Sequence, residues 1–179
     1  MKIIYILIGL FLSTHLTYGQ KFLTKQGEIS FLSETPIEDI KSENHQVLSV
    51  VDAKDGTIAI AILMKSFSFE KSLMQEHFNE NYVESDLYPK ATFKGKIESV
   101  TADYVGEKEV VVKGDITIHG ITKTISINAE LVKTTENIAL SGVFKITIAD
   151  FNIEIPSVVA NNIAETMDVT FLLDHSLYQ

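Results

Sequence analysis

The stretch Val110–Leu131, with the sequence VVVKGDITIHGITKTISINAEL, decides the fold because it holds two alternating segments joined at a glycine. In each segment the hydrophobic residues share one parity and most polar residues take the other. Alternation of this kind predicts β-strands with one buried face. Gly120 stands between the segments and favours a reversal of the chain, so we expect an antiparallel hairpin. The predicted buried face carries Val110, Val112, Ile116, Ile118, Ile125, Ile127, Ala129 and Leu131.

Six other segments are predicted to be strands, and all of them except 57–65 alternate in the same way: 28–34, 46–51, 57–65, 91–97, 138–148 and 167–173. Asp55-Gly56 favours a two-residue hairpin turn, and Pro89 imposes an extended chain at its own position and the one before. Segment 57–65 is hydrophobic on both faces, so we expect another element to cover its outer face. Residues 70–81 place hydrophobic side chains every three to four positions, which predicts a short amphipathic helix as the candidate cover.

Eight sequential strands with mostly short connections predict an all-β fold. Eight is the number at which an antiparallel up-and-down barrel closes around side chains or one small ligand. We therefore expect an eight-stranded antiparallel up-and-down barrel with one short helix between the third and fourth strands. A β-sandwich is the alternative fold.

The N-terminal segment Met1–Gly19 has the pattern of a secretory signal, with a lysine, an apolar core and a polar exit. Thr17 and Gly19 place small residues where signal peptidases need them, so we expect cleavage after Gly19 and a periplasmic or secreted protein. The apolar core of about ten residues is shorter than the roughly 20 of a spanning helix, so no stable membrane insertion is expected. Residues 20–179 are expected to form one barrel domain.

Composition argues against several classes of function. The chain has 24 acidic and 15 basic residues and a net charge of −9, which argues against nucleic-acid binding. All the basic residues are lysines, so there is no guanidinium group to bind phosphate or carboxylate through two hydrogen bonds. The absence of cysteine excludes disulfides and thiolate chemistry.

No sequence motif indicates catalysis or a bound cofactor. The G-x-S-x-G pattern, glycine-rich phosphate loops and EF-hand spacing are all missing from the sequence. The histidines His45, His77, His119 and His175 are scattered without metal-ligand spacing. We therefore expect no catalytic residue, cofactor or metal site. His119, at the predicted turn, either meets a polar ligand end at a barrel mouth or bonds to nearby backbone.

The predicted inward faces mix large hydrophobic residues with glycine and alanine. Small inward residues let strands bend or leave room for a ligand, so composition alone allows both a packed core and a cavity. A hydrophobic cavity with few polar groups would suit a lipid tail, and a larger side chain at Ala129 should project into it. The candidate cavity residues, taken from strand parity, are Phe31, Ile60, Ile62, Phe93, Ile97, Ile116, Ile118, Ile125, Ile127, Ala129, Leu140, Gly142, Phe144, Ile146, Val169 and Phe171.

Three segments resemble the YceI-like family. Gly114–Lys123, GDITIHGITK, resembles the family core G-D-L-T-x-H-G-V-T-K, and Tyr88–Gly95, YPKATFKG, is similar to its Y-P-x-A-x-F segment. Residues 67–85 resemble the short helical excursion of the family, and together the matches span 27–174. The resemblance implies a lipocalin-like antiparallel barrel, exported in bacteria, that holds a long isoprenoid chain in its interior. It therefore favours a cavity over a packed core.

The chain departs from the family pattern near Asp150-Phe151. Many relatives have an arginine shortly before an S-D-F-G segment, and here neither that arginine nor the glycine is present. The resemblance therefore supports tail binding more than a particular head group. The leading hypothesis is an exported carrier that binds an isoprenoid or similar long apolar lipid without catalysis. The alternatives are a structural or interaction protein with a packed barrel, and an enzyme acting on a small apolar substrate.

Overall fold

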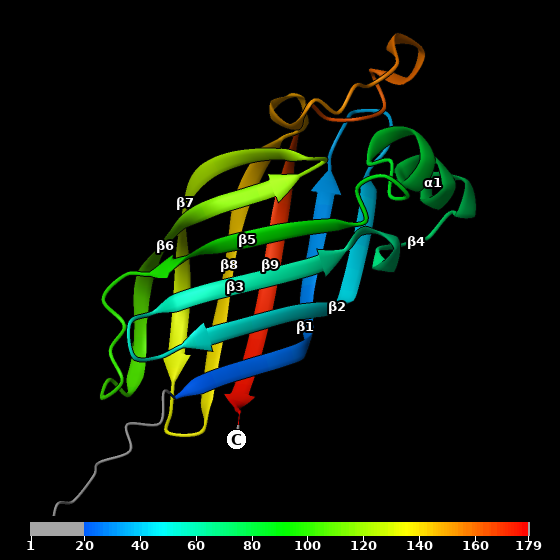
Figure 1. Cartoon of the computed structure of the whole chain (residues 1–179). Helices are drawn as coiled ribbons and strands as arrows, with labels where there is room; N and C mark the ends of the chain where they lie inside the picture. Colours follow the sequence, from blue (N-terminus) through cyan, green and yellow to red (C-terminus); the bar gives the residue numbers. More distant parts are fainter. Residues whose placement is uncertain (1–19, 179) are drawn as a thin grey trace, which may run out of the picture.

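The computed structural model describes residues 20–178, which form a closed β-sheet with a few short helical segments (Figure 1). A two-residue strand, β4 (Ser68–Phe69), pairs with one end of the second long strand. The eight long strands are β1 (Lys21–Ser33), β2 (Ile40–Asp52), β3 (Thr57–Leu63), β5 (Lys90–Ile97), β6 (Gly106–Ile118), β7 (Ile121–Lys133), β8 (Asn137–Thr147) and β9 (Thr166–Leu177).

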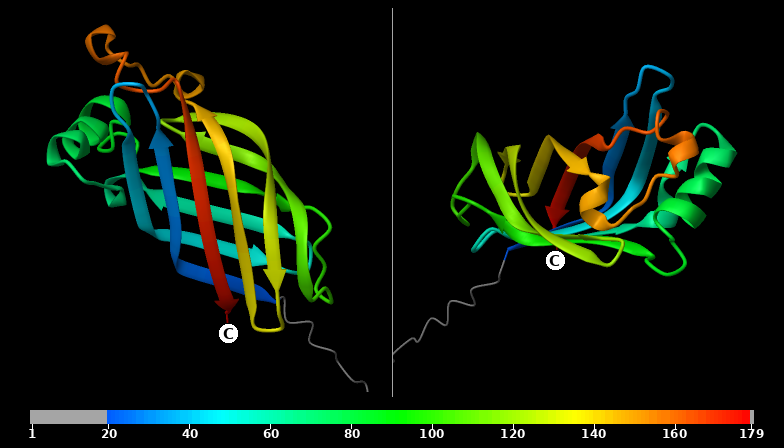
Figure 2. Two further views of the ribbon diagram at one scale, coloured as in Figure 1. Left: turned by 180° about the vertical axis from the view of Figure 1, so that it is seen from behind. Right: turned by 90° about the horizontal axis from the view of Figure 1, so that it is seen from above.

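The long strands follow one another around the barrel in chain order. Each is antiparallel to its neighbours, and β1 pairs with both β2 and β9, which closes the sheet. Figure 2 shows this arrangement from behind and from above. The closed sheet confirms the predicted eight-stranded up-and-down barrel, whereas a β-sandwich would need two separate sheets.

The hairpin predicted from the central stretch is formed by β6 and β7. Their register runs without interruption to the pair Ile118 and Ile121, so only His119 and Gly120 make the loop. Both have positive φ, 49° and 75°, as a type I′ hairpin turn requires. Glycine suits this position for a second reason, since a Cβ there would lie 2.8 Å from the ring of Tyr88.

β1 begins at Lys21, whereas the sequence pattern placed its start at residue 28. The reason is a pair of register shifts between β1 and β2, on either side of Gly27. They change the parity of the inward residues, so Phe22 and Thr24 do not alternate in step with the later part of the strand. A search for strict alternation finds only that later part.

β2 begins at Ile40 rather than residue 46, and here polar inward residues hide the strand. In the part that the pattern missed, Ser42 and Asn44 are buried on the inner face. The Asn44 amide donates to the carbonyl oxygen of Leu63 at 3.0 Å, and its side-chain oxygen accepts from the backbone N–H of Gln46 at 2.9 Å. Because such bonds offset the cost of burial, polar residues are tolerated where the pattern required hydrophobic ones.

The helix predicted at 70–81 is a short α-helix, α1 (Ser72–His77), followed by the π-helical turn η2 (Phe78–Tyr82). The expectation that it covers the outer face of β3 is wrong. On that face Ala59 is exposed, and 43% of Leu63 is accessible to solvent. The helix lies instead at one end of the barrel (Figure 1), where its hydrophobic side chains meet the interior.

The two ends of the barrel differ. At one end, here called the mouth, lie α1, η2 and the β8–β9 connection, which contains η3 (Ile148–Phe151) and η4 (Ser157–Val159) (Figure 2). Near the other end, the closed end, the loop between β5 and β6 carries the buried Val100. The buried Lys133 amine donates to the carbonyl oxygens of Ala102 and Tyr104 of this loop, at 2.8 and 2.7 Å.

The closed half of the barrel is packed. Its interior carries Phe22, Val51, Ile97, Leu131 and Ile138, all with no measurable solvent exposure. Close packing of this kind contributes about 1.5–3 kcal/mol for each large hydrophobic side chain that is removed from water. Within residues 20–178, no helix has both the length and the hydrophobicity to cross a membrane.

Candidate ligand-binding cavity

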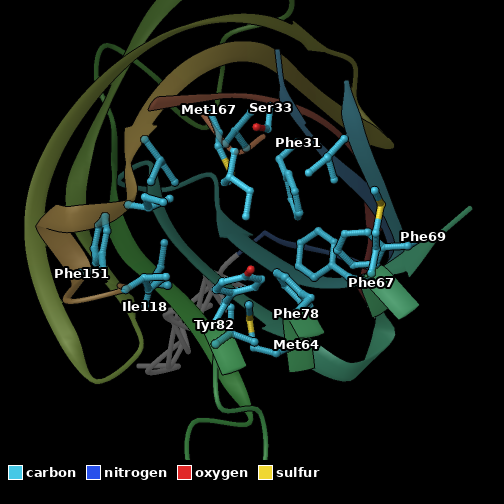
Figure 3. Close-up of a pocket in the computed structure, with 18 of the residues that line it drawn as sticks. Phe31, Ser33, Met64, Phe67, Phe69, Phe78, Tyr82, Ile118, Phe151 and Met167 are labelled. Carbon is cyan, nitrogen blue, oxygen red and sulfur yellow. The ribbon is translucent and has the colours of Figure 1, made fainter. Parts of the chain in front are cut away.

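A cavity of about 340 Å³ lies in the mouth half of the barrel (Figure 3). Inward residues of the strands form one part of its wall, and α1, η2 and the β8–β9 connection form the rest. The volume is within the range of cavities that hold small ligands. Hydrophobic side chains dominate the wall, among them Phe31, Ile62, Met64, Phe67, Phe78, Phe151, Met167 and Val169.

Four phenylalanines hold the helical segment against the strands. Phe31 of β1 stacks on Phe78 of η2, with ring centroids 5.7 Å apart. Phe69 of β4 lies 5.0 Å from Phe78, and Phe67 lies 5.5 Å from Phe31. Each such pair contributes about 0.5–1.5 kcal/mol beyond simple burial. Since an isolated helix as short as α1 is not stable in water, this packing keeps the segment folded at the mouth.

A second cavity, of about 60 Å³, lies deeper in the barrel. Five residues line both cavities, so the two are adjacent: Ile29, Ile62, Ala91, Ile116 and Phe144. Apart from Thr92, every residue that lines this deep cavity is hydrophobic. The interior therefore passes from a wide mouth half, through a small deep cavity, to the packed closed end.

The structure distributes the predicted cavity residues by depth. The mouth cavity alone is lined by Phe31, Ile118, Ile146 and Val169, and both cavities by Ile62, Ile116 and Phe144. The deep cavity alone is lined by Ile60, Phe93, Ile125, Ile127, Leu140 and Phe171. Ile97, Ala129 and Gly142 line neither cavity. Ile97 and Ala129 lie further toward the closed end, whereas Gly142 pairs with Phe171 at the level of the deep cavity. Parity predicts the face of a strand and carries no information on depth along the barrel axis.

Residues outside the eight long strands form much of the wall that the predicted cavity residues do not account for. One group comes from α1 and its flanks, and its hydrophobic spacing in the sequence was visible as a helix face. The other comes from the β8–β9 connection, where Phe151, Ile153 and Ile155 alternate with polar residues but do not form a strand. These wall residues are Met64, Phe67, Phe69, Leu73, Met74, Phe78, Tyr82, Val83, Ile148, Phe151, Ile153, Ile155, Val159 and Ile163.

Few polar side chains line the mouth cavity. The Ser33 hydroxyl accepts a hydrogen bond from the backbone N–H of Ala164 at 2.8 Å, and Glu38 forms an ion pair with Lys71. Burial raises the pKa of Tyr82, so its phenol stays protonated and neutral at ordinary pH. No lysine belongs to the wall formed by the described residues. The cavity is therefore suited to a neutral, largely hydrophobic ligand.

His119 joins three segments at the mouth. Its Nδ1 lies 3.1 Å from the carbonyl oxygen of Phe151, and its Nε2 lies 2.7 Å from a carboxylate oxygen of Glu84. Tyr88 packs against the ring at a centroid distance of 4.4 Å. The sequence suggested that His119 either meets a polar ligand end or bonds to nearby backbone. Neither interpretation describes this geometry fully, because both partners belong to the protein and both are distant in sequence. His119 instead ties the β6–β7 hairpin to the segments that frame the cavity.

The histidines do not gather at one place in the described part of the chain. In the part of the chain from 20 to 178, no group of three or more histidine, cysteine, aspartate or glutamate residues could hold a metal ion. His45 lies on the surface between Glu28 and Glu43, and His175 is buried at the closed end. Of the four histidines in the described part of the chain, only His77 lines the mouth cavity.

Comparison with known proteins places the sequence in a family. The model of the YceI-like domain matches residues 13–174. The chain belongs to the YceI-like family. The match covers nearly the whole chain and agrees with the segments from which the resemblance was inferred. Among curated proteins, no significant match is found.

Solved structures of YceI-like and related proteins share the fold. A polyisoprenoid binding domain from Saccharophagus degradans is 17% identical with a TM-score of 0.77, and the match covers 90% of this chain and all of that domain. BcnA of Burkholderia cenocepacia is 18% identical with a TM-score of 0.69, over 86% of this chain and 96% of BcnA. The YceI protein of Campylobacter jejuni is 19% identical with a TM-score of 0.65, over 82% and 90% of the two chains. At these identities the likeness establishes the lipocalin-like fold.

Proposed function

We propose that this protein is an exported carrier that binds an isoprenoid or a similar long apolar lipid inside the barrel, without catalysing a reaction. The observation that carries the proposal is the hydrophobic cavity of about 340 Å³ between a framed mouth and a packed closed end. Each methylene group that such a cavity removes from water contributes about 0.8 kcal/mol. The name of the Saccharophagus relative, a polyisoprenoid binding domain, supports this ligand class.

The depth profile supports a tail-first orientation of the lipid. The polar residues that line the mouth cavity are Ser30, Ser33, Glu38, His77, Tyr82 and Asn162. Thr92 is the one polar residue among those that line the deep cavity. A hydrocarbon tail loses no hydrogen bonds on entering the deep region, while a polar head would lose several. We infer that the head group stays near the mouth.

The export part of the proposal rests on sequence. Met1–Gly19, the predicted signal segment, lies outside the described residues. Its short apolar core and the small residues Thr17 and Gly19 support cleavage after Gly19, which would leave the barrel domain as residues 20–179 in the periplasm or outside the cell. The alternative of a packed barrel that acts through its outer surface requires a filled interior, and only the closed half is filled.

Lipid extraction from natively purified protein tests the proposed function. The protein is purified without detergent, extracted with organic solvent, and the extract is analysed by mass spectrometry. We expect one class of long-chain lipid at close to one molecule per protein. An unrelated exported protein from the same cells, purified in the same way, controls for carry-over. Recovery of no lipid above that control would contradict the proposal.

A further inference from the structure

Two phenylalanines narrow the deep cavity from opposite sides of the barrel. Phe93 belongs to β5 and Phe171 to β9, and three strands separate these two in either direction around the closed sheet. Both side chains line the deep cavity and neither lines the mouth cavity. A tail that enters from the mouth therefore meets both rings only after it has passed the residues around Ala91 that the two cavities share.

Glycines fix where the Phe93 ring lies. Gly95 and Gly114 face each other across β5 and β6, beyond Phe93 in the direction of the closed end. A Cβ at Gly95 would come within 2.7 Å of the Cζ atom of Phe93, and one at Gly114 within 2.8 Å. The atoms nearest to a Cβ at either glycine are backbone atoms of the paired strand, at 2.4 Å, so neither position has room for a side chain and the Phe93 ring lies over both. It lies against the barrel wall instead of crossing the interior.

On the opposite side of the barrel, a glycine also lies beside the Phe171 ring. Its register partner on β8 is Gly142, where a Cβ would lie 2.9 Å from the Cζ atom of Phe171 and 3.0 Å from the carbonyl oxygen of Asn128. The ring also packs edge-on against Phe144, with centroids 6.1 Å apart. Small inward residues here leave room for aromatic rings against the wall, and both rings line the deep cavity of about 60 Å³.

We propose that Phe93 and Phe171 set the length of hydrocarbon tail that the barrel can bury, with Gly142 holding the Phe171 ring out of the tail's path. This inference rests on the proposed lipid-binding function and adds a specificity rule to it. Beyond the two rings the interior is packed by side chains such as Ile97 and Leu131, which are fully buried. A tail therefore gains contacts with each added unit until it reaches this level, and further units remain outside.

The proposal predicts that two kinds of variant change the longest tail that the barrel can bury in opposite directions. Phe93→Leu and Phe171→Leu each remove part of a ring and enlarge the deep cavity. Gly142→Ala adds a methyl group that the Phe171 ring must move to accommodate, so the ring enters the cavity and shortens it. Val143→Ala is the matched control, since Val143 is the next residue of β8 and is 60% exposed on the outer face.

The experiment measures dissociation constants of the delipidated protein for a series of all-trans isoprenols that differ by one isoprene unit. For the wild type, affinity should rise with length and then reach a plateau. We expect the plateau at least one unit later in Phe93→Leu and Phe171→Leu, one unit earlier in Gly142→Ala, and unchanged in Val143→Ala. At the longest tail that the wild type buries, Gly142→Ala should bind about tenfold or more weakly.

Two outcomes would overturn the proposal, and they differ from each other. If melting curves show folded variants that bind isoprenols with the wild-type plateau, the two rings do not set the length, although lipid binding itself stands. If the wild-type protein binds no isoprenol of any length, the carrier function fails and the length rule fails with it. Using three independent variants keeps the test decisive when one of them does not fold.

Discussion

His175 shows how a single polar residue can be built into the closed end of the barrel. It is fully buried, its Nδ1–H donates to the carbonyl oxygen of Ile138 at 2.8 Å, and its Nε2 accepts from the Ser49 hydroxyl at 2.8 Å. The neutral imidazole satisfies both bonds. Burial lowers the pKa of His175, because the charged ring would have to leave water.

This burial predicts a loss of stability in mild acid. The pKa in the unfolded chain is about 6.5 and the folded pKa is lower, so below pH 6.5 the unfolded state binds a proton that the folded state does not. The free energy of unfolding should therefore fall as the pH decreases from 6.5 toward the folded pKa, by up to about 1.4 kcal/mol per pH unit. Urea unfolding between pH 7.5 and 5 measures the slope.

His175→Gln provides the comparison, because an amide can bond to both partners and does not titrate. The surface histidines remain in both proteins and contribute equally. We expect a shallower pH dependence in His175→Gln than in the wild type over this range. Equal slopes would show that the buried imidazole does not control acid stability.

At the scale of elements, the β6–β7 hairpin acts as a clamp on the mouth. His119 connects it to Glu84, which follows η2, and to Phe151 in η3. His119→Asn keeps a residue that tolerates positive φ but shortens the side chain, so both contacts should be lost. We expect faster hydrogen exchange in residues 78–88 and 148–153, and a faster release of bound lipid, with the strands unchanged.

Thr122→Ala is the control for the hairpin itself. The Thr122 hydroxyl lies 2.8 Å from that of Thr117 on the exposed face, away from the mouth segments. Removing it should alter exchange only within the hairpin. Equal protection of residues 78–88 in His119→Asn and the wild type would contradict the role of His119 as a clamp.

The elements also show which parts of the fold a sequence can predict. Alternation located all eight long strands, because each has a hydrophobic inner face for most of its length. The predicted β1 was too short because a register shift changes the parity of its inward residues. The predicted β2 was too short because its inner face carries polar residues such as Asn44, whose polar atoms are hydrogen-bonded within the barrel. The sequence pattern also misplaced α1, because periodicity shows that a helix has a hydrophobic face and does not show which surface that face covers.

At the scale of the whole molecule, the interior changes from open to packed along one axis. Sequence predicted the inward residues of this interior, but Ala129 and Ile97 belong to the packed part while Ile118 belongs to the open part. Which residues lie at which depth follows from strand tilt and stagger, and these appear only when the barrel closes. The sequence therefore left open whether the barrel was hollow or filled. In the structure the mouth half holds a cavity and the closed half is packed.

The depth profile changes the position at which cavity binding is best tested. Ala129, at 5% exposure and outside both cavities, would report on core packing, where added volume typically costs about 1–3 kcal/mol. Ala91 lines both cavities, so a ring added there would stand across the path of a lipid tail. Ala59 lies on the exposed face of the neighbouring strand β3 and offers the same substitution without access to the interior.

The most direct test of the central claim is the amount of lipid per protein in Ala91→Phe and Ala59→Phe, purified side by side with the wild type and shown to be folded by their melting curves. If the barrel interior holds the lipid, Ala91→Phe should lose most of its lipid and Ala59→Phe should retain the wild-type amount. A folded Ala91→Phe protein that keeps its full lipid content would contradict the claim that the tail occupies the barrel.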